Sequence, residues 1–162
     1  MSKNNLSVVR EERTIRMSRI FDAPRELVWK ICTDPQLVPK WWGPRYLTTF
    51  VDKMDLRVGG TWRYIQRDPN GQEHAFNGVY KEVTPPERLT YTFEYEPMAG
   101  HISTETVILE ELADGKTQIT NVAVFASLED LEGMLQSGME GGATETWDRL
   151  EELLVEAQKE PR

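Results

Sequence analysis

The chain has 162 residues, of which 39% are hydrophobic, so length and composition predict one domain, 1–162, with a single hydrophobic core. The formal net charge is −8, and segment 127–160 holds ten of the 27 acidic residues but two of the 19 basic ones, which leaves 17 of each sign elsewhere. Because no basic stripe offsets this acidic run, which is typical of a solvated helix face, we expect no nucleic acid partner.

The N-terminal part of the chain predicts a poorly ordered segment followed by one strand. Residues 1–11 are expected to be poorly ordered, and the first nine contain no apolar core of signal-peptide length. No run in the chain reaches the roughly 18 apolar residues of a membrane span, so we expect a cytoplasmic protein without one. Residues 12–21 mix β-forming and polar residues in rough alternation, as a half-buried strand does.

Two short helices are expected next. Pro24 fits the first turn of a helix over 25–33, because the missing N–H of proline would be unpaired there. This helix contains the single cysteine, Cys32, so a disulfide framework is excluded, and its apolar neighbour favours burial over a reactive thiol. A second short helix, 36–42, is expected to stop at Gly43-Pro44.

The middle of the chain predicts a meander of six strands. Turn sequences rich in glycine, proline, asparagine and aspartate separate segments that alternate between apolar and polar residues. The clearest alternation lies in 88–96, where aromatic residues and leucine share one face. The expected strands span 46–56, 61–68, 74–83, 88–96, 103–112 and 116–125.

The last segment, 127–158, predicts one long amphipathic helix, because apolar residues recur along it at steps of three and four. Ser127 can cap its first turn. Its interior contains glycines that each cost roughly 0.5–1 kcal/mol relative to alanine, so we expect a kink or break near Gly141. These glycines either leave a poorly formed turn or leave room for a ligand beneath the helix; they are Gly133, Gly138, Gly141 and Gly142.

The order of elements, one strand, two helices, six strands and one helix, predicts an α+β fold. We expect an antiparallel sheet with one buried face, which the apolar stripe of the last helix covers.

The chain offers little recognisable catalytic chemistry. His74 and His101 lack the spacing of a zinc site, so no metal is expected. The sequence contains no nucleophile elbow, phosphate-binding glycine loop or dinucleotide fingerprint, so we assign no catalytic residue and expect no cofactor.

Aromatic residues on the inward phase of the strands are the unusual feature. They form either a plain core or the wall of a cavity, and a few polar residues of the same phase favour the cavity, because small-molecule sites combine apolar walls with sparse polar groups. An empty apolar cavity of ~300 Å³ would cost on the order of 7 kcal/mol, so a large one would be difficult to explain as an accident of packing. The expected wall and end residues are Trp42, Trp62, Tyr64, Phe76, Tyr80, Tyr91, Phe93, Met139 and Trp147, with Gln66, His74 and Asn121 orienting the ligand.

Several motifs, taken together and in order, resemble a known family, the homologues of the activator of the ninety-kilodalton heat-shock protein ATPase, within the START-like or SRPBCC superfamily. The resemblance covers about 13–154. It implies a helix-grip (Bet v-like) fold, with a curved seven-stranded antiparallel sheet around the long C-terminal helix and an apolar cavity between them. The motifs are 19–29, Thr33-Asp34-Pro35, Trp41-Trp42-Gly43-Pro44, Gly59-Gly60, Asp68-Pro69-Asn70-Gly71, Gly78-Val79-Tyr80 and Pro85-Pro86-Glu87-Arg88-Leu89.

One departure from the family concerns the last helix. Many relatives place a tryptophan where this chain has Ala143 and a leucine where it has Trp147. The large ring lies one turn further along, so the shape of the cavity cannot be taken from a relative.

Three functions are compatible with the sequence. The first is a binding protein for a small hydrophobic, aromatic or lipid-like molecule, in which Gly138→Leu would block uptake. The second is a cyclase or hydrolase that uses the same cavity with His74 as general base. The third is a chaperone ATPase-activating or stress-response module acting through its surface, which the family resemblance implies.

Overall fold

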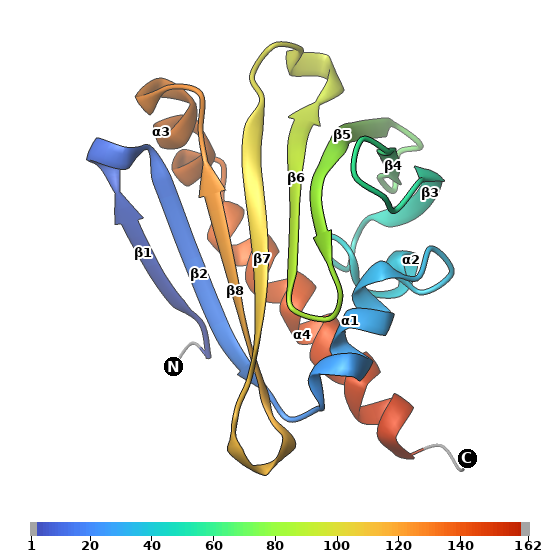
Figure 1. The fold of residues 1–162 in the computed structure, drawn as a ribbon. Coiled ribbons are helices and arrows are strands. Elements are labelled where there is room, and N and C mark those ends of the chain that lie inside the picture. Colours follow the sequence, from blue (N-terminus) through green and yellow to red (C-terminus); the bar gives the residue numbers. More distant parts are fainter. Residues whose placement is uncertain (1–2, 160–162) are drawn as a thin grey trace.

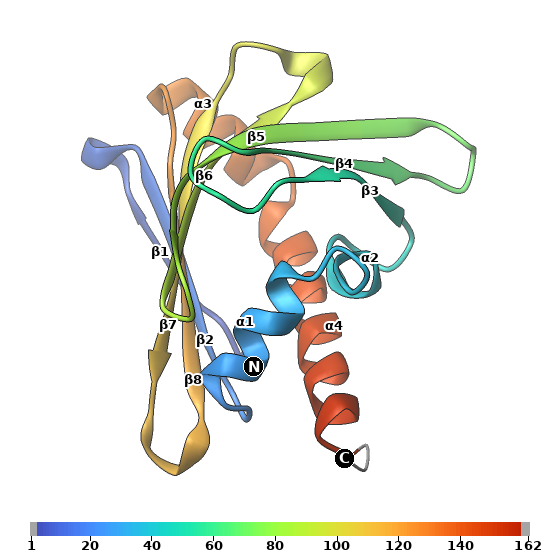
Figure 2. The same ribbon diagram turned by 45° about the vertical axis from the view of Figure 1, so that its right-hand side comes forward.

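The computed structural model describes residues 3–159 and shows an antiparallel sheet that curves around a long C-terminal helix (Figures 1 and 2). Eight strands form this sheet in the order β1-β2-β8-β7-β6-β5-β4-β3. The predicted α+β helix-grip fold is confirmed. The strands are β1 (Asn5–Val9), β2 (Thr14–Phe21), β3 (Thr48–Met54), β4 (Thr61–Arg67), β5 (Glu73–Thr84), β6 (Arg88–Tyr95), β7 (Ser103–Glu111) and β8 (Thr117–Val124).

The helices lie on the concave side of this sheet. In Figure 2 the sheet bends over α1, α2 and α4, and α4 runs along its open, concave side. None of the helices in residues 3–159 is long and apolar enough to cross a membrane. The α-helices are α1 (Arg25–Thr33), α2 (Val38–Trp41), α3 (Leu128–Gln136) and α4 (Met139–Lys159).

Strand β1 is the main difference from the expected fold, which had seven strands and poorly ordered residues 1–11. Residues 5–9 pair antiparallel with β2, with Leu6 opposite Met17 and Val8 opposite Ile15. Leu6 and Val8 pack against buried clusters, which stabilises this edge strand. The first two residues of the expected segment lie outside the described part of the chain.

The predicted hairpins form because their turn residues supply the required local geometry. Between β4 and β5, the Asp68 side chain accepts hydrogen bonds from the backbone N–H groups of Asn70 at 2.9 Å and Gln72 at 3.0 Å. Gly71 has a φ of +83°, a conformation that glycine adopts without strain. This turn sets the register in which Gln66 faces His74 across the two strands.

The C-terminal segment forms two helices in place of the one expected. Gly138, with a φ of +83°, separates α3 from α4, so the break lies before the Gly141 that the sequence analysis favoured. The predicted cap is present, since Ser127 Oγ accepts a hydrogen bond from the Asp130 N–H at 3.0 Å. Each helix therefore meets the sheet at its own angle (Figure 1).

The buried side chains gather into three clusters. The largest contains Phe21, Ile119 and Trp147, and it joins α1 and α4 to strands β2, β7 and β8. A second cluster, around Leu131, fixes α3. The third cluster is aromatic and centres on Trp62 on the other half of the sheet.

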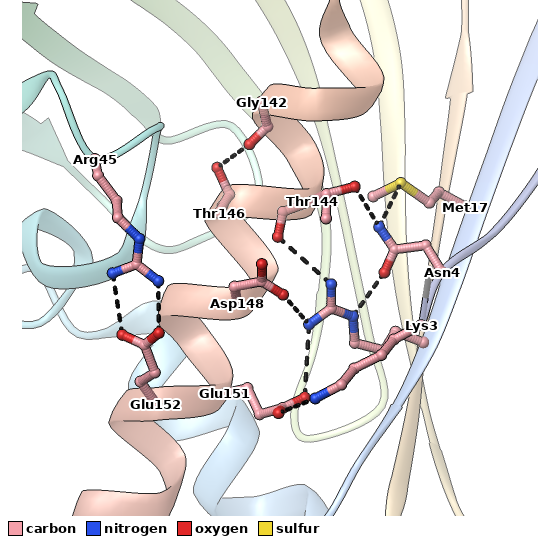
Figure 3. A network of polar contacts seen from close by, with 11 residues as sticks. Lys3, Asn4, Met17, Arg45, Gly142, Thr144, Thr146, Asp148, Glu151 and Glu152 are labelled. Atoms are coloured by element: carbon pink, nitrogen blue, oxygen red, sulfur yellow. Dashed lines mark hydrogen bonds and ion pairs between the residues drawn. The ribbon is translucent and has the colours of Figure 1, made fainter. Parts of the chain in front are cut away.

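A buried cation fixes α4 to strand β2. The Arg19 side chain on β2 is 1% exposed, and its Nη1 lies 2.9 Å from Asp148 Oδ1 and 3.5 Å from Glu151 Oε1 on α4. Its Nε donates a hydrogen bond to Asn4 Oδ1 at 2.6 Å. Figure 3 shows Asp148 and Glu151 on the side of α4 that faces β2. Part of the acidic run that we expected to be solvated therefore holds the helix in place.

Two further arginines connect α4 to α2 and to the loop after it. Arg149 Nη1 donates to the Gly43 carbonyl at 2.7 Å, and Arg149 Nη2 donates to the Lys40 carbonyl at 3.0 Å. Arg45, on that loop, forms a two-pronged ion pair with Glu152 (Figure 3). These contacts position the Trp42 region beside the helix, where it forms part of the site described next.

Candidate functional site

The candidate site is a cavity of about 370 Å³ between the concave face of the sheet and helices α1, α2 and α4. Small-molecule pockets span about 300–1,000 Å³, so this cavity is at the small end of that range. Its volume equals that of roughly a dozen water molecules at about 30 Å³ each. The cavity therefore suits a compact ligand.

Aromatic rings from strands β4, β5 and β6 form one wall. The Trp62 ring centroid lies 4.8 Å from that of Tyr64, 5.7 Å from Tyr91 and 5.9 Å from Phe93. Such spacings are typical of favourable ring pairs, each worth about 0.5–1.5 kcal/mol beyond the area buried. Each ring of this wall is therefore in contact with neighbouring rings.

Gly78 makes room for the central ring of this wall. It lies opposite Trp62 in the β4–β5 register. A Cβ at this position would lie 2.5 Å from Trp62 Nε1 and 1.8 Å from the Thr92 carbonyl oxygen, which itself accepts a hydrogen bond from Trp62 Nε1 at 3.2 Å. The glycine therefore allows the indole to lie against the strand.

The loop after α2 closes one side of the cavity. Trp42 packs edge-on against Tyr64 at 5.0 Å and against Phe76 at 5.4 Å between ring centroids. Gln66 is buried, and its Nε2 lies 2.0 Å from where a Gly43 Cβ would be, so this glycine permits the close approach. The predicted end residue Trp42 thus lies on the cavity wall.

A carboxyl group lies on the mostly apolar wall of the cavity, and the sequence analysis missed it. Glu105 on β7 lines the cavity and lies opposite Tyr91 of β6. Its Oε1 accepts a hydrogen bond from Asn121 Nδ2 at 3.2 Å, and its Oε2 accepts one from Ser103 Oγ at 3.5 Å. Burial raises the pKa of Glu105, although the two hydrogen bonds oppose this shift. The pair of Glu105 and Asn121 forms the polar end of the site.

The other titratable groups on the wall are uncharged near neutral pH. Burial raises the pKa of the Cys32 thiol to about 12 and that of the Tyr80 hydroxyl to about 12. It also raises the pKa values of Tyr64 and Tyr91 well above their ordinary range. Cys32, which we expected to be buried, is half-buried on the cavity wall, and a thiol of such high pKa is a poor nucleophile.

The structure brings most of the predicted site residues together. Those that line the cavity are Trp42, Trp62, Tyr64, Gln66, Phe76, Tyr80, Tyr91, Phe93, Asn121, Met139 and Trp147. His74 and Gly138 are not among the lining residues.

His74 lies near the far end of the β4–β5 hairpin. One ring nitrogen is 2.9 Å from Tyr95 Oη and the other is 3.3 Å from Asp68 Oδ2. Figure 2 shows this end of the hairpin extending beyond the helices, so the inward phase of the strands is not covered there. His74 therefore contacts its neighbours on the hairpin and not the cavity.

Of the four glycines in the C-terminal segment, Gly142 is the one that lines the cavity. Gly138 is exposed, and a Cβ there would meet no atom within 4 Å, so Gly138→Leu would not block the cavity as expected from the sequence. Ala143 and Trp147 both line the cavity, and the Trp147 ring also packs edge-on against Phe21 at 5.8 Å. The small residue thus leaves space one turn before the large ring.

Comparison with known sequences identifies the family. The profile of the family described as "Activator of Hsp90 ATPase homolog 1-like protein" matches residues 22–155. The chain belongs to this family. The resemblance found in the sequence motifs is thereby confirmed. No curated protein matches the chain.

Solved structures of bacterial proteins share the fold along almost the whole chain. Protein Ms6760 from Mycobacterium smegmatis is 28% identical, with a TM-score of 0.83 over 93% of this chain and 95% of its own. A protein from Arthrobacter aurescens is 25% identical, with a TM-score of 0.86 over 94% and 91%. Protein CV1439 from Chromobacterium violaceum is 29% identical, with a TM-score of 0.71 over 88% and 96%.

Proposed function

We propose that this protein binds a small, mostly apolar molecule in the cavity between the sheet and α4. The cavity itself is the observation that supports this function. Its volume of about 370 Å³ lies in the range of small-molecule pockets, and it is open to solvent, so a ligand can enter it. An apolar ligand would displace water from the aromatic wall, at roughly 25 cal/mol for each Å² of apolar surface removed from water.

The chemistry of the wall supports an aromatic or alicyclic ligand. Trp62, Phe93 and Trp42 offer ring faces and edges, and Met139 adds an adaptable side chain on the helix side. The polar end at Glu105 and Asn121 would orient the ligand, as sparse polar groups do in small-molecule sites.

Two other functions have weaker support. A cyclase or hydrolase would act in the same cavity, but the general base considered for it, His74, lies on the hairpin outside the cavity. A chaperone ATPase-activating or stress-response role rests on the family name. A cytoplasmic location remains a prediction from the sequence.

Native mass spectrometry of freshly purified protein, followed by denaturation, tests the proposed function. The expected result is a bound small molecule, or, after delipidation, saturable 1:1 binding of the fluorescent probe N-phenyl-1-naphthylamine with quenching of tryptophan emission. A chain that carries no small molecule and shows no saturable binding of this probe would contradict the proposal and favour a role of the surface.

A further inference from the structure

We infer that the ligand of this cavity is an apolar or aromatic amine whose ammonium group pairs with the carboxyl group of Glu105. This inference rests on the proposed function and specifies the chemical class of the ligand. It starts from the one acidic side chain on the cavity wall.

Glu105 has no cationic partner among residues 3–159. No lysine, arginine or histidine nitrogen of the described chain lies within 4.0 Å of its carboxyl oxygens, although most arginines of the protein form ion pairs elsewhere. Glu105 is half-buried, and a carboxylate that has lost much of its solvent without gaining a countercharge is costly, so proteins normally pair such groups. A cationic ligand would supply the missing charge.

The hydrogen bonds around Glu105 favour the ionised form as the partner of the ligand. Asn121 Nδ2 donates to one carboxyl oxygen and Ser103 Oγ donates to the other, at 3.2 and 3.5 Å. A protonated carboxyl group could keep both contacts and donate to a neutral ligand, but it would carry no charge to pair with an ammonium group. An ammonium group can instead donate to the lone pairs that remain on both oxygens.

The walls near Glu105 complement the rest of such a ligand. Tyr91 lies directly across from Glu105, and its ring packs edge-on against Trp62 at 5.7 Å. Aromatic faces attract cations and also bury apolar rings. A molecule with an aromatic body and an aminomethyl group would therefore place its charge at Glu105 and its ring among the aromatic side chains.

A matched pair of probes of equal shape tests the inference. 2-Naphthylmethylamine and 2-naphthylmethanol differ in the amine and hydroxyl groups alone, and both can be titrated at pH 7 by displacement of N-phenyl-1-naphthylamine. We expect the amine to bind at least about tenfold more tightly than the alcohol, as a charge-assisted hydrogen bond implies. In Glu105→Gln, which keeps the shape and the acceptor for Asn121, this preference should disappear.

Glu110→Gln is the matched control. Glu110 lies on the same strand as Glu105 but is exposed on the other face, so its substitution removes the same charge from the protein without touching the cavity. The amine preference should persist in this variant. Loss of the preference in both variants would mean that it reflects the net negative charge of the protein, and it would overturn the inference.

The pH dependence of amine binding provides a second readout. Glu105 must be ionised to pair with an ammonium group, and burial raises the pKa of Glu105. The affinity for the amine should therefore fall as Glu105 becomes protonated at lower pH, whereas the affinity for the alcohol should not. The other titratable groups on the wall have pKa values raised to about 12 or well above the ordinary tyrosine range, so they stay protonated at and below neutral pH; they are Cys32, Tyr64, Tyr80 and Tyr91. This pH dependence should be absent in Glu105→Gln.

The outcomes separate the two proposals. If the amine and the alcohol bind wild-type protein equally, or if Glu105→Gln leaves the preference unchanged, the inference is wrong while the proposed function stands. If neither probe nor N-phenyl-1-naphthylamine binds, the proposed function fails, and the inference fails with it.

Discussion

Filling the cavity from α4 should strengthen the fold and weaken ligand binding at the same time. Gly142 lines the cavity, and a Cβ at this position would meet no atom within 4 Å. In Gly142→Leu, the helix would gain roughly 0.5–1 kcal/mol from propensity, and burial of the leucine would add about 1.5–3 kcal/mol. The free energy of unfolding should therefore rise on the order of 2–4 kcal/mol.

The same leucine should occupy space that the ligand needs. We expect the affinity for N-phenyl-1-naphthylamine to fall at least about tenfold, which corresponds to 1.4 kcal/mol. Urea unfolding followed by tryptophan fluorescence gives the stability, and titration of the probe gives the affinity.

Gly141→Leu is the control for this pair of effects. Gly141 is the preceding residue of α4, it is exposed, and a Cβ there also meets no atom within 4 Å. This variant should gain the helix-propensity term of roughly 0.5–1 kcal/mol and bind the probe normally. If Gly142→Leu destabilises the protein, or binds the probe as wild type does, the reasoning about the cavity is refuted.

Three further predictions concern buried charged and polarisable groups. Glu105→Gln should have nearly the same unfolding free energy as wild type below about pH 4. Because the folded-state pKa of Glu105 is raised, wild type loses stability as the pH rises through that pKa, and the variant should become the more stable of the two. A difference in unfolding free energy that does not change with pH would contradict this. The Cys32 thiol, with a pKa raised to about 12, should react with a disulfide reagent at pH 8 roughly a thousandfold more slowly in the native protein than after unfolding, and fast native labelling would show that the thiol is not buried. Arg19→Met should lower the unfolding free energy by about 2 kcal/mol, because it removes a guanidinium group that is 1% exposed and pairs with acidic side chains of α4. Arg45→Met removes an exposed pair with Glu152 and should cost less than about 1 kcal/mol. Equal effects of the two substitutions in urea unfolding would refute the importance of burial.

Much of the fold follows from local patterns that the sequence displays. The strict alternation around Tyr91, the turn at Gly71 and the cap at Ser127 all depend on nearby residues, and each is present as expected. The edge strand 5–9 was missed because it is short and polar on its outer face. Its alternating Leu6 and Val8 were the signal that could have identified it.

The position of the helix break could not be read from the pattern. Several glycines in the segment have similar propensities, and the one that turns the chain is chosen by how the two helices meet the sheet. Gly138 adopts the left-handed conformation, while Gly141 and Gly142 continue the helix. The position of the break therefore depends on tertiary packing and not on local helix propensity alone.

The polar residues of the site show the limit of reasoning by strand phase. His74 and Phe76 share one phase, yet His74 lies near the end of the hairpin that no helix covers. Glu105 is in phase with Val107 and Leu109, so the alternation of β7 did indicate an inward carboxyl group. Phase gives the face of a strand, whereas the position along the strand relative to the helices decides whether that face is enclosed.

Each of the three buried clusters contributes a residue to the cavity wall. Trp147 belongs to the largest cluster, Met139 packs against the cluster around Leu131, and Trp62 belongs to the aromatic cluster. A bound molecule would complete contacts on all three sides, so unfolding and ligand release would be linked by mass action. At a free concentration of 100 times the dissociation constant, such a ligand would add about 2.7 kcal/mol to the apparent stability. The melting temperature of the protein is therefore a sensitive detector for its own unknown ligand in a collection of compounds.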